Sequence, residues 1–403
     1  MEPTSPSASE PAGHRPRLSA ALRQEERVTP LELFFDLVFV LAITQCTQLM
    51  SDDPTWGGLA QGIVVLGVLW WSWVGYAWLT SVVDPEEDAV RGVVFIAMAA
   101  LLVVALAVPK SFEYLGATFA VAYGVVRFGQ IGLFWIASHD DPALRQSVVG
   151  LAGSTAVGVG ILLAASFLDG FAQGAVWGLA LALDMAGPYF FGAEGWKLMP
   201  AHFAERHGLI VIIALGESIV AIGVGVGGEL SVGQGAAAVV GIGLAAAMWW
   251  LYFDVVALVA ARRLERAKVG RQQNEMARDS YSYLHFPMVA GIVLVALAMK
   301  KTLGDVEEPL KVVPAFALLG GLAMYLMAHV GFRYRHIRTI NTRRGGLALI
   351  LLALLPLGVE IPALATVAVV TVLLWALIVY ETRSYGESRA RVRHETFAPE
   401  APS

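Results

Sequence analysis

Long apolar runs separated by short polar stretches occupy this chain from residue 31 to residue 381. A helix needs about 20 mostly apolar residues to cross a hydrocarbon core about 30 Å thick. The pattern therefore predicts an all-α transmembrane bundle of about 12 spans. These lie at residues 31–50, 57–80, 90–108, 113–136, 148–168, 173–191, 208–227, 235–260, 283–300, 312–333, 345–358 and 361–381.

The last two predicted spans are open to a second interpretation. The eleventh is short, and Pro356 and Pro362 blur its boundary with the twelfth. This pair of segments is therefore compatible with a re-entrant hairpin as well as with two full crossings.

Composition supports a membrane location. Of the 403 residues, 57% are hydrophobic and 15% are charged, and the mean hydropathy is +0.64. These values exclude an ordinary soluble domain and make the lipid bilayer the expected partner. The charges fall at the predicted membrane edges, which argues against nucleic acid as a partner. The single cysteine, Cys46, excludes an intrachain disulfide framework, a redox pair and a thiolate metal cluster.

The positions of Lys and Arg predict the orientation, because cytoplasmic loops carry an excess of these residues. With the N-terminus inside, 23 of the 28 Lys and Arg residues fall in inner segments and 4 in outer loops, while Arg127 lies within the fourth span. The count predicts cytoplasmic termini, an even number of spans and a multi-pass protein of the cytoplasmic membrane.

Polar segments flank the apolar region. Residues 1–28 and 383–403 are expected to be disordered cytoplasmic tails, and the first of them lacks the apolar core of a cleaved secretory signal. The region between them is expected to consist of two six-helix repeats, at residues 29–192 and 193–382.

Three landmarks recur in the same order in these two repeats. Val-Ala-Leu-Ala at 104–107 returns at 295–298, and the Trp pair at 70–71 returns at 249–250. Asp36 of the first span has a counterpart in Glu217 of the seventh. Six crossings return the chain to the side of the membrane on which it started. The two repeats should therefore be parallel and related by an axis along the membrane normal.

Carboxylates interrupt two of the apolar runs: Glu32 and Asp36 in the first, and Glu217 in the seventh. A charge at the centre of a membrane helix costs about 2.5–3.5 kcal/mol on insertion scales, so it should face a bundle interior, a hydrated cavity or a counter-charge. Glu32 and Asp36 are four residues apart and share one helix face. Glu32 also lies close enough to the predicted interface to be solvated.

Three further charges lie singly within other spans: Arg127, Asp184 and Asp254. Arg127 is the one full cation expected at that depth and is the expected counter-charge for one or more of the buried acids. The leading hypothesis pairs it with Asp36 and Glu217. Acids in excess of this cation are candidates to bind a proton or a cation. In the alternative interpretation, Asp184 and Asp254 bond locally, and Asp36 with Arg127 only fixes the helix register.

A polar cluster of Glu205, Arg206 and His207 precedes Gly208 at the cytoplasmic mouth of the seventh span. It is expected either to cap a helix or to form a gate. The sequence contains no HExxH motif, no Ser-His-Asp series and no phosphate-cradling glycine loop. Neither a catalytic set, a metal site nor a cofactor is therefore expected.

Two motifs resemble the signature of the bacterial low temperature requirement A (LtrA) family. They are the run from Leu31 to Val40, and Glu205-Arg206-His207-Gly208-Leu209 followed by Gly216-Glu217-Ser218. The resemblance implies an integral membrane protein of many helices, named for a cold-growth phenotype and without an established biochemical activity.

A fainter likeness concerns the segment from Phe35 to Thr44, which is similar to the first-helix motif of the lysosomal-type potassium and proton channels. Those channels are also built from six-helix repeats. The second half departs from their pattern, because Leu215-Gly216-Glu217-Ser218 lacks the aromatic-Asp pair.

The leading functional hypothesis is a transporter or channel for a cation, proton or small solute that uses the buried acids. The alternatives are an intramembrane enzyme acting on a lipid-type substrate, and a structural or sensory membrane protein in cold adaptation. Assembly into a homo-oligomer is left open by the sequence.

Overall fold

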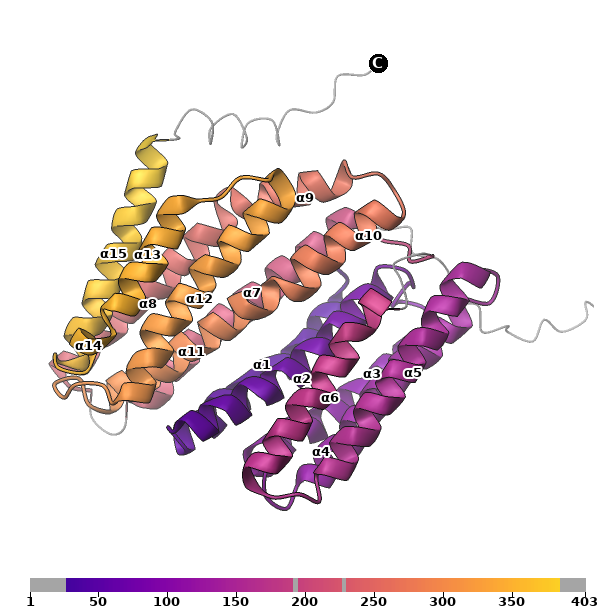
Figure 1. Cartoon of the computed structure of the whole chain (residues 1–403), viewed down its shortest axis with the longest axis horizontal. Helices are drawn as coiled ribbons and strands as arrows, with labels where there is room; N and C mark the ends of the chain where they lie inside the picture. Colours follow the sequence, from indigo (N-terminus) through magenta and orange to yellow (C-terminus); the bar gives the residue numbers. More distant parts are fainter. Residues whose placement is uncertain (1–26, 191–194, 227–229, 385–403) are drawn as a thin grey trace, which may run out of the picture.

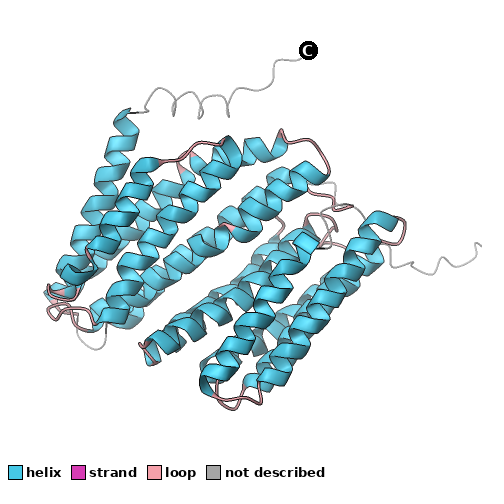
Figure 2. Ribbon diagram, viewed as in Figure 1, coloured by secondary structure: helices cyan, strands magenta, loops and turns pink. Residues whose placement is uncertain are grey.

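A computed structural model describes residues 27–190, 195–226 and 230–384. In those ranges it consists of helices joined by loops and turns, without strands (Figure 2). Nearly all of the predicted tails, at 1–28 and 383–403, lie outside the described residues, as does the predicted repeat boundary at 192–193.

Helices α1–α6 form the first half of the molecule. Local signals fix several of their starts: Thr29 and Glu32 form a capping box at α1, and Pro30 occupies its first turn. Asp141 caps α5 by accepting from the Leu144 N–H at 3.1 Å, and this bond, aided by nearby Lys197, holds the pKa of the Asp141 carboxyl below its usual value. The elements are α1 (Pro30–Asp52), α2 (Trp56–Thr80), α3 (Asp88–Ala107), η1 (Val108–Lys110), α4 (Gly116–Ala137), α5 (Pro142–Ala165) and α6 (Gly170–Phe190).

Helices α7–α15 form the second half. A π-helical turn, η2, leads into α11 and widens the helical run Arg271–Gly304 locally. The elements are α7 (Pro200–Gly225), α8 (Val232–Phe253), α9 (Val256–Glu265), α10 (Arg271–Ala277), η2 (Arg278–Tyr283), α11 (His285–Gly304), α12 (Val312–Ile337), α13 (Thr342–Ala353), α14 (Leu355–Gly358) and α15 (Ala363–Ser384).

Within the described part of the chain, ten helices or consecutive helical runs are long and apolar enough to cross a membrane. The sixth and eleventh predicted spans, which correspond to α6 and to α13 with α14, are not among the ten. The protein is therefore an all-helical membrane protein, and the total of twelve crossings stays a prediction.

One predicted span is interrupted. The apolar run at 235–260 predicted a continuous helix, but α8 ends at Phe253 and α9 begins at Val256. Val255 leaves the helical conformation, with φ −138° and ψ −32°. Irregular backbone at membrane depth is tolerated only where protein or a hydrated cavity satisfies its polar groups.

The two halves have the same order of helix neighbours. In the first, α1 packs against α2 and α3, α3 against α4, α4 against α5, and α6 against α5 and α2. In the second, α7 packs against α8 and α11, α11 against α12, α12 against α13, and α15 against α13 and α8. Figure 1 shows α1–α6 on one side of the molecule and α8–α15 on the other. Contacts of α1 with α7 and α11, and of α2 with α11, join the halves.

The outward faces of the bundle are apolar. Large hydrophobic side chains such as Ile96, Leu106, Val157, Leu349 and Val372 are exposed on α3, α5, α13 and α15. Exposed apolar side chains repeated over several helices are what a lipid-facing surface requires.

Two long helices of the second half approach each other closely at Gly291 on α11 and Gly321 on α12. A Cβ atom added at Gly291 would lie 2.6 Å from the carbonyl oxygen of Gly321, and one added at Gly321 would lie 2.9 Å from that of Gly291. Small residues allow this spacing, since helices inside a membrane associate mainly by close packing.

Gly291→Ala should force α11 and α12 apart and lower stability by about 1–3 kcal/mol, the usual cost of overpacking. Thermal unfolding in detergent, followed by tryptophan fluorescence, measures the change. Gly160→Ala on α5 is the matched control, since its added Cβ meets no atom within 4 Å among the described residues. A Gly291→Ala protein as stable as the control would contradict the packing described.

Candidate functional site

A buried ion cluster joins α1 to α7. The guanidinium of Arg206 donates from Nη1 to Glu32 Oε1 at 2.9 Å and from Nη2 to Asp36 Oδ1 at 2.7 Å. Arg206 Nη1 also donates to Thr80 Oγ1 at 3.2 Å, and Trp73 Nε1 donates to Asp36 Oδ1 at 2.9 Å. The charged side chains are almost completely inaccessible to solvent. One arginine is thus shared by two buried carboxylates, and its single positive charge balances only one of their two negative charges.

Glu32 is held from three directions. Its Oε2 accepts from the backbone N–H of Thr29 at 2.9 Å, which completes the capping box of α1. Its Oε1 lies 2.9 Å from His202 Nε2, and His202 Nδ1 lies 3.2 Å from Ser81 Oγ. The expectation that Glu32 is solvated at the interface is wrong, because the capping box turns its carboxylate into the bundle.

The predicted gate-or-cap residues separate in the structure. Glu205 is exposed, and its Oε2 accepts from the backbone of Val28 at 3.4 Å. Arg206 and His207 are fully buried. Because α7 begins at Pro200, the interpretation of these residues as a helix cap is wrong. His207 donates from Nδ1 to the Phe203 carbonyl at 2.8 Å, assigning the proton to Nδ1.

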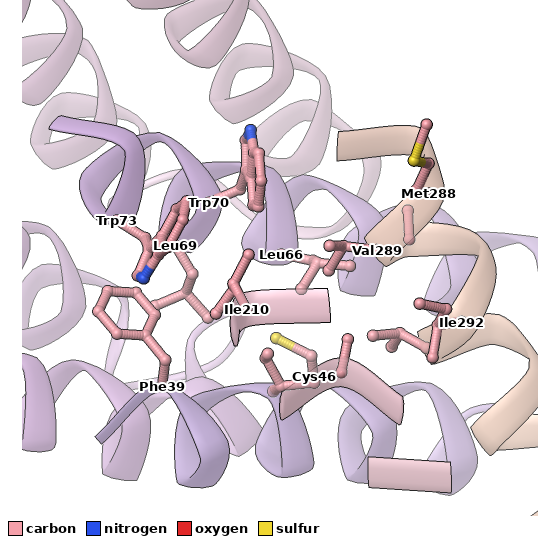
Figure 3. Packing of buried hydrophobic residues seen from close by; sticks show 14 of the residues in the cluster. Phe39, Cys46, Leu66, Leu69, Trp70, Trp73, Ile210, Met288, Val289 and Ile292 are labelled. Carbon is pink, nitrogen blue, oxygen red and sulfur yellow. The ribbon is translucent and has the colours of Figure 1, made fainter. Parts of the chain in front are cut away.

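An apolar layer lies next to the ion cluster on the interface between the halves. Phe39 of α1, Leu69 of α2, Ile210 of α7 and Val289 of α11 are buried and belong to the hydrophobic core. Figure 3 shows these side chains packed together with Cys46. The layer separates the ion cluster from a second polar contact farther along the same helices.

That second contact joins Glu217 to Thr44. Thr44 Oγ1 donates to Glu217 Oε2 at 2.5 Å, across the boundary between α1 and α7. Eight residues separate Asp36 from Thr44, a rise of about 12 Å along the helix. Farther along α1, Gln48 Oε1 accepts from Lys300 Nζ on α11.

Arg127 pairs with a buried acid, as expected, but that acid is Asp184, so the predicted pairing with Asp36 and Glu217 is wrong. Its Nη2 lies 3.2 Å from both carboxylate oxygens of Asp184 on α6, deep in the first half. Thr155 Oγ1 donates to the same carboxylate at 3.1 Å, and Arg127 Nη1 lies 3.5 Å from the Trp71 carbonyl oxygen. Asp36 bonds to Arg206 of α7 instead.

The second half holds a similar pair that the sequence did not indicate. Arg344 on α13 donates to both oxygens of Glu381 on α15, at 3.1 and 2.9 Å, and to the Leu251 carbonyl at 3.2 Å. Both residues lie at the ends of predicted spans, where charged side chains are common, so the sequence offered no reason to single them out. The remaining predicted acid, Asp254, is half-buried at the end of α8.

A histidine and tyrosine cluster occupies the second half beside the ion cluster. His207 and His285 lie with ring centres 5.2 Å apart, and Tyr281 stacks on His285 at 5.0 Å. His285 accepts at Nε2 from Tyr252 and donates at Nδ1 to the Ser280 carbonyl. Over the ranges that the structure describes, no group of three or more His, Cys, Asp or Glu side chains is placed to hold a metal ion.

The motifs around Asp36 and Glu217 thus lie on α1 and α7, two of the helices that join the halves. The family model of the bacterial low temperature requirement A protein (LtrA) matches residues 27–379. The chain belongs to the LtrA family.

Comparison with known proteins extends this assignment. A protein of Rhizobium meliloti (strain 1021), with the name "Uncharacterized protein RA0937", is 29% identical to this LtrA protein over 307 residues. The matched part covers 73% of this chain and 74% of the relative. No solved structure matched this LtrA protein at a significant level.

Arg206→Met should lower the stability of this LtrA protein by about 3–5 kcal/mol, because it leaves two buried carboxylates without their cation. Thermal unfolding in detergent measures the loss. Adding Glu32→Gln and Asp36→Asn to Arg206→Met should restore most of it. Arg91→Gln, which removes an exposed ion pair with Glu86, is the control and should change stability by at most about 1 kcal/mol. Equal losses in Arg206→Met and Arg91→Gln would contradict the role of the cluster.

Proposed function

We propose that this LtrA protein is a transporter or channel of the cell membrane that moves a proton or a small cation, with Glu217 as the exchange site. The observation that carries the proposal is the position of Glu217. Its side chain is 2% exposed and bonds to Thr44 from the other half, and in the described ranges no Lys or Arg lies within salt-bridge distance of it.

A carboxylate buried in this way is costly unless it is protonated or meets a cation. The hydroxyl of Thr44 can hydrogen-bond to both the ionised and the protonated side chain of Glu217. It lies 2.5 Å from Glu217 Oε2 and 3.0 Å from the Val40 carbonyl oxygen. With Glu217 ionised, the hydroxyl donates to the carboxylate; with Glu217 protonated, it accepts from the carboxyl and donates to Val40.

The surroundings of Glu217 also suit the exchange of a proton or cation with the two sides of the membrane in turn. On one side, the apolar layer with Phe39 and Ile210 separates it from the Arg206 cluster. On the other, Gln48 and Lys300 continue the polar path along α1 and α11. A hydrophobic constriction of this kind gates by excluding water, and it opens when the two halves move relative to one another.

The same proposal retains twelve spans, two parallel repeats and cytoplasmic termini. It gives up the equivalence of Asp36 and Glu217, because Asp36 lies at the level of Arg206, eleven residues before Glu217 on α7. The matching order of helix neighbours in the two halves supports the parallel repeats. So does the placement of the buried arginines: Arg127 and Arg344 each pair with an acid on the last helix of their half, and each lies near a carbonyl oxygen of its second helix.

Glu217→Gln should insert and fold normally but reduce flux at least about tenfold, since a neutral amide cannot exchange a proton or attract a cation. Purified protein in proteoliposomes, with a pH-sensitive dye inside and K⁺ or Na⁺ gradients imposed, measures the flux. Glu360→Gln at an exposed position is the control. Thr44→Val should also reduce flux, whereas Thr44→Ser should retain most of it.

Flux that is unchanged in Glu217→Gln, in protein with normal melting behaviour, would refute the proposal. If Glu217→Gln lowers the melting temperature while the unsubstituted protein shows no flux of any tested cation, a structural or sensory role takes its place.

A further inference from the structure

A polar stripe follows α1 from the contact with Glu217 to the exposed end of the helix. Thr44, Gln48 and Asp52 are spaced four residues apart and so share one face. Thr44 and Gln48 are half-buried, whereas Asp52 is exposed. Gln48 Nε2 donates to Asp52 Oδ1 at 2.5 Å. The stripe therefore leads from a buried carboxyl group to the surface.

The ammonium group of Lys300 lies beside this stripe. Its Nζ donates to Gln48 Oε1, one helical turn beyond Thr44, and the side chain is half-buried. A Cβ atom added at Gly225, the last residue of α7, would lie 3.1 Å from the Lys300 carbonyl oxygen and 3.5 Å from its Cα. Lys300 thus lies where α1, α7 and α11 meet, and its charge is near enough to act on Glu217.

A positive charge at this position opposes the passage of a metal cation. Like charges repel more strongly beside a protein interior than in water, because the effective dielectric constant is lower. Charged side chains that line a pore select ions for this reason. An ion such as K⁺ or Na⁺ that moves along the stripe must pass close to the Lys300 ammonium, and Lys301 adds a second positive charge to the same end of α11.

The surroundings of Glu217 also suit a proton better than a metal cation. A potassium site replaces the hydration shell of the ion with several carbonyl oxygens at once. The hydroxyl groups that interact with Glu217 belong to Thr44 and Thr47. Each also lies within hydrogen-bond distance of a carbonyl of its own helix, Val40 at 3.0 Å and Ile43 at 3.3 Å. A proton needs a single acceptor, which the Glu217 carboxylate supplies alone.

Protons and metal cations also move differently. A proton is passed between hydrogen-bonded groups, so it needs no opening as wide as an ion and no shell of ligands along the way. A lysine ammonium itself holds protons that it can release and regain. Lys300 is therefore a smaller obstacle to a proton than to a metal cation.

We infer that Lys300 determines the specificity of the exchange site: it excludes metal cations from Glu217 and leaves the proton as the exchanged species. This inference rests on the proposed function, since it names the substrate of the same site.

The test measures two fluxes through the full chain in proteoliposomes. An enclosed pH-sensitive dye reports proton flux, with K⁺ and valinomycin setting the membrane potential. Uptake of radioactive Na⁺ or Rb⁺, measured without valinomycin, reports metal-cation flux. The unsubstituted protein should move protons at a rate that Glu217→Gln reduces at least about tenfold, and should take up neither metal ion faster than protein-free liposomes do.

The variants change the charge of Lys300. Lys300→Met keeps an unbranched side chain of similar length without the charge, and should raise Na⁺ or Rb⁺ uptake at least about tenfold while proton flux stays within about fivefold. Lys300→Gln, which can still donate to Gln48, should behave in the same way. Lys300→Arg keeps the charge and should exclude both metal ions. Lys311→Met, at an exposed lysine before α12, is the matched control and should change neither flux.

Metal-ion uptake gained in Lys300→Met or Lys300→Gln, but not in Lys300→Arg or Lys311→Met, supports the inference. Uptake of Na⁺ or Rb⁺ by the unsubstituted protein that Glu217→Gln abolishes overturns it, while Glu217 remains the exchange site. Exclusion of both metal ions by Lys300→Met and Lys300→Gln proteins with normal melting behaviour overturns it as well. If the unsubstituted protein moves neither protons nor metal ions, the proposed function fails and this inference fails with it.

Discussion

Arg206 on α7 donates to both Glu32 and Asp36 on α1, and this buried cluster ties the first half of the molecule to the second. Charges in a low-dielectric interior must be compensated, so α1 and α7 can approach each other only in a register that brings the three side chains together. The same register sets Thr44 of α1 opposite Glu217 of α7.

Two kinds of buried acid follow from that register. Asp36 and Asp184 bond to the guanidinium groups of Arg206 and Arg127, although Asp36 shares Arg206 with Glu32. Glu217 has a hydroxyl as its partner, and a hydroxyl can serve a carboxylate or a carboxyl. In the function proposed above, the acids bonded to arginine hold the architecture together, and Glu217 between the halves changes its protonation or its counter-ion.

The lengths of the apolar runs predicted where most helices lie, because the thickness of the hydrocarbon core sets the length of a membrane-spanning helix. The capping box of Thr29 and Glu32 is predictable from the local sequence, since Thr-Pro-Leu-Glu begins an apolar run. The pairing of Arg206 with Glu32 and Asp36 was not predictable. The apolar pattern placed the start of the seventh span at residue 208, so Arg206 lay outside the predicted membrane region. The break of α8 at Asp254 was missed because the apolar pattern continues through it. Pairings between distant helices depend on packing that local patterns do not contain.

The most direct measurement is infrared difference spectroscopy of the purified protein in liposomes, with the pH varied across neutrality and with K⁺ or Na⁺ added. The account predicts a carbonyl stretch of a protonated carboxyl that appears and disappears with pH or cation, and that is missing in Glu217→Gln but present in Glu360→Gln. A spectrum in which no titrating carboxyl band depends on Glu217, under any of these conditions, would contradict the assignment of Glu217 as the exchange site.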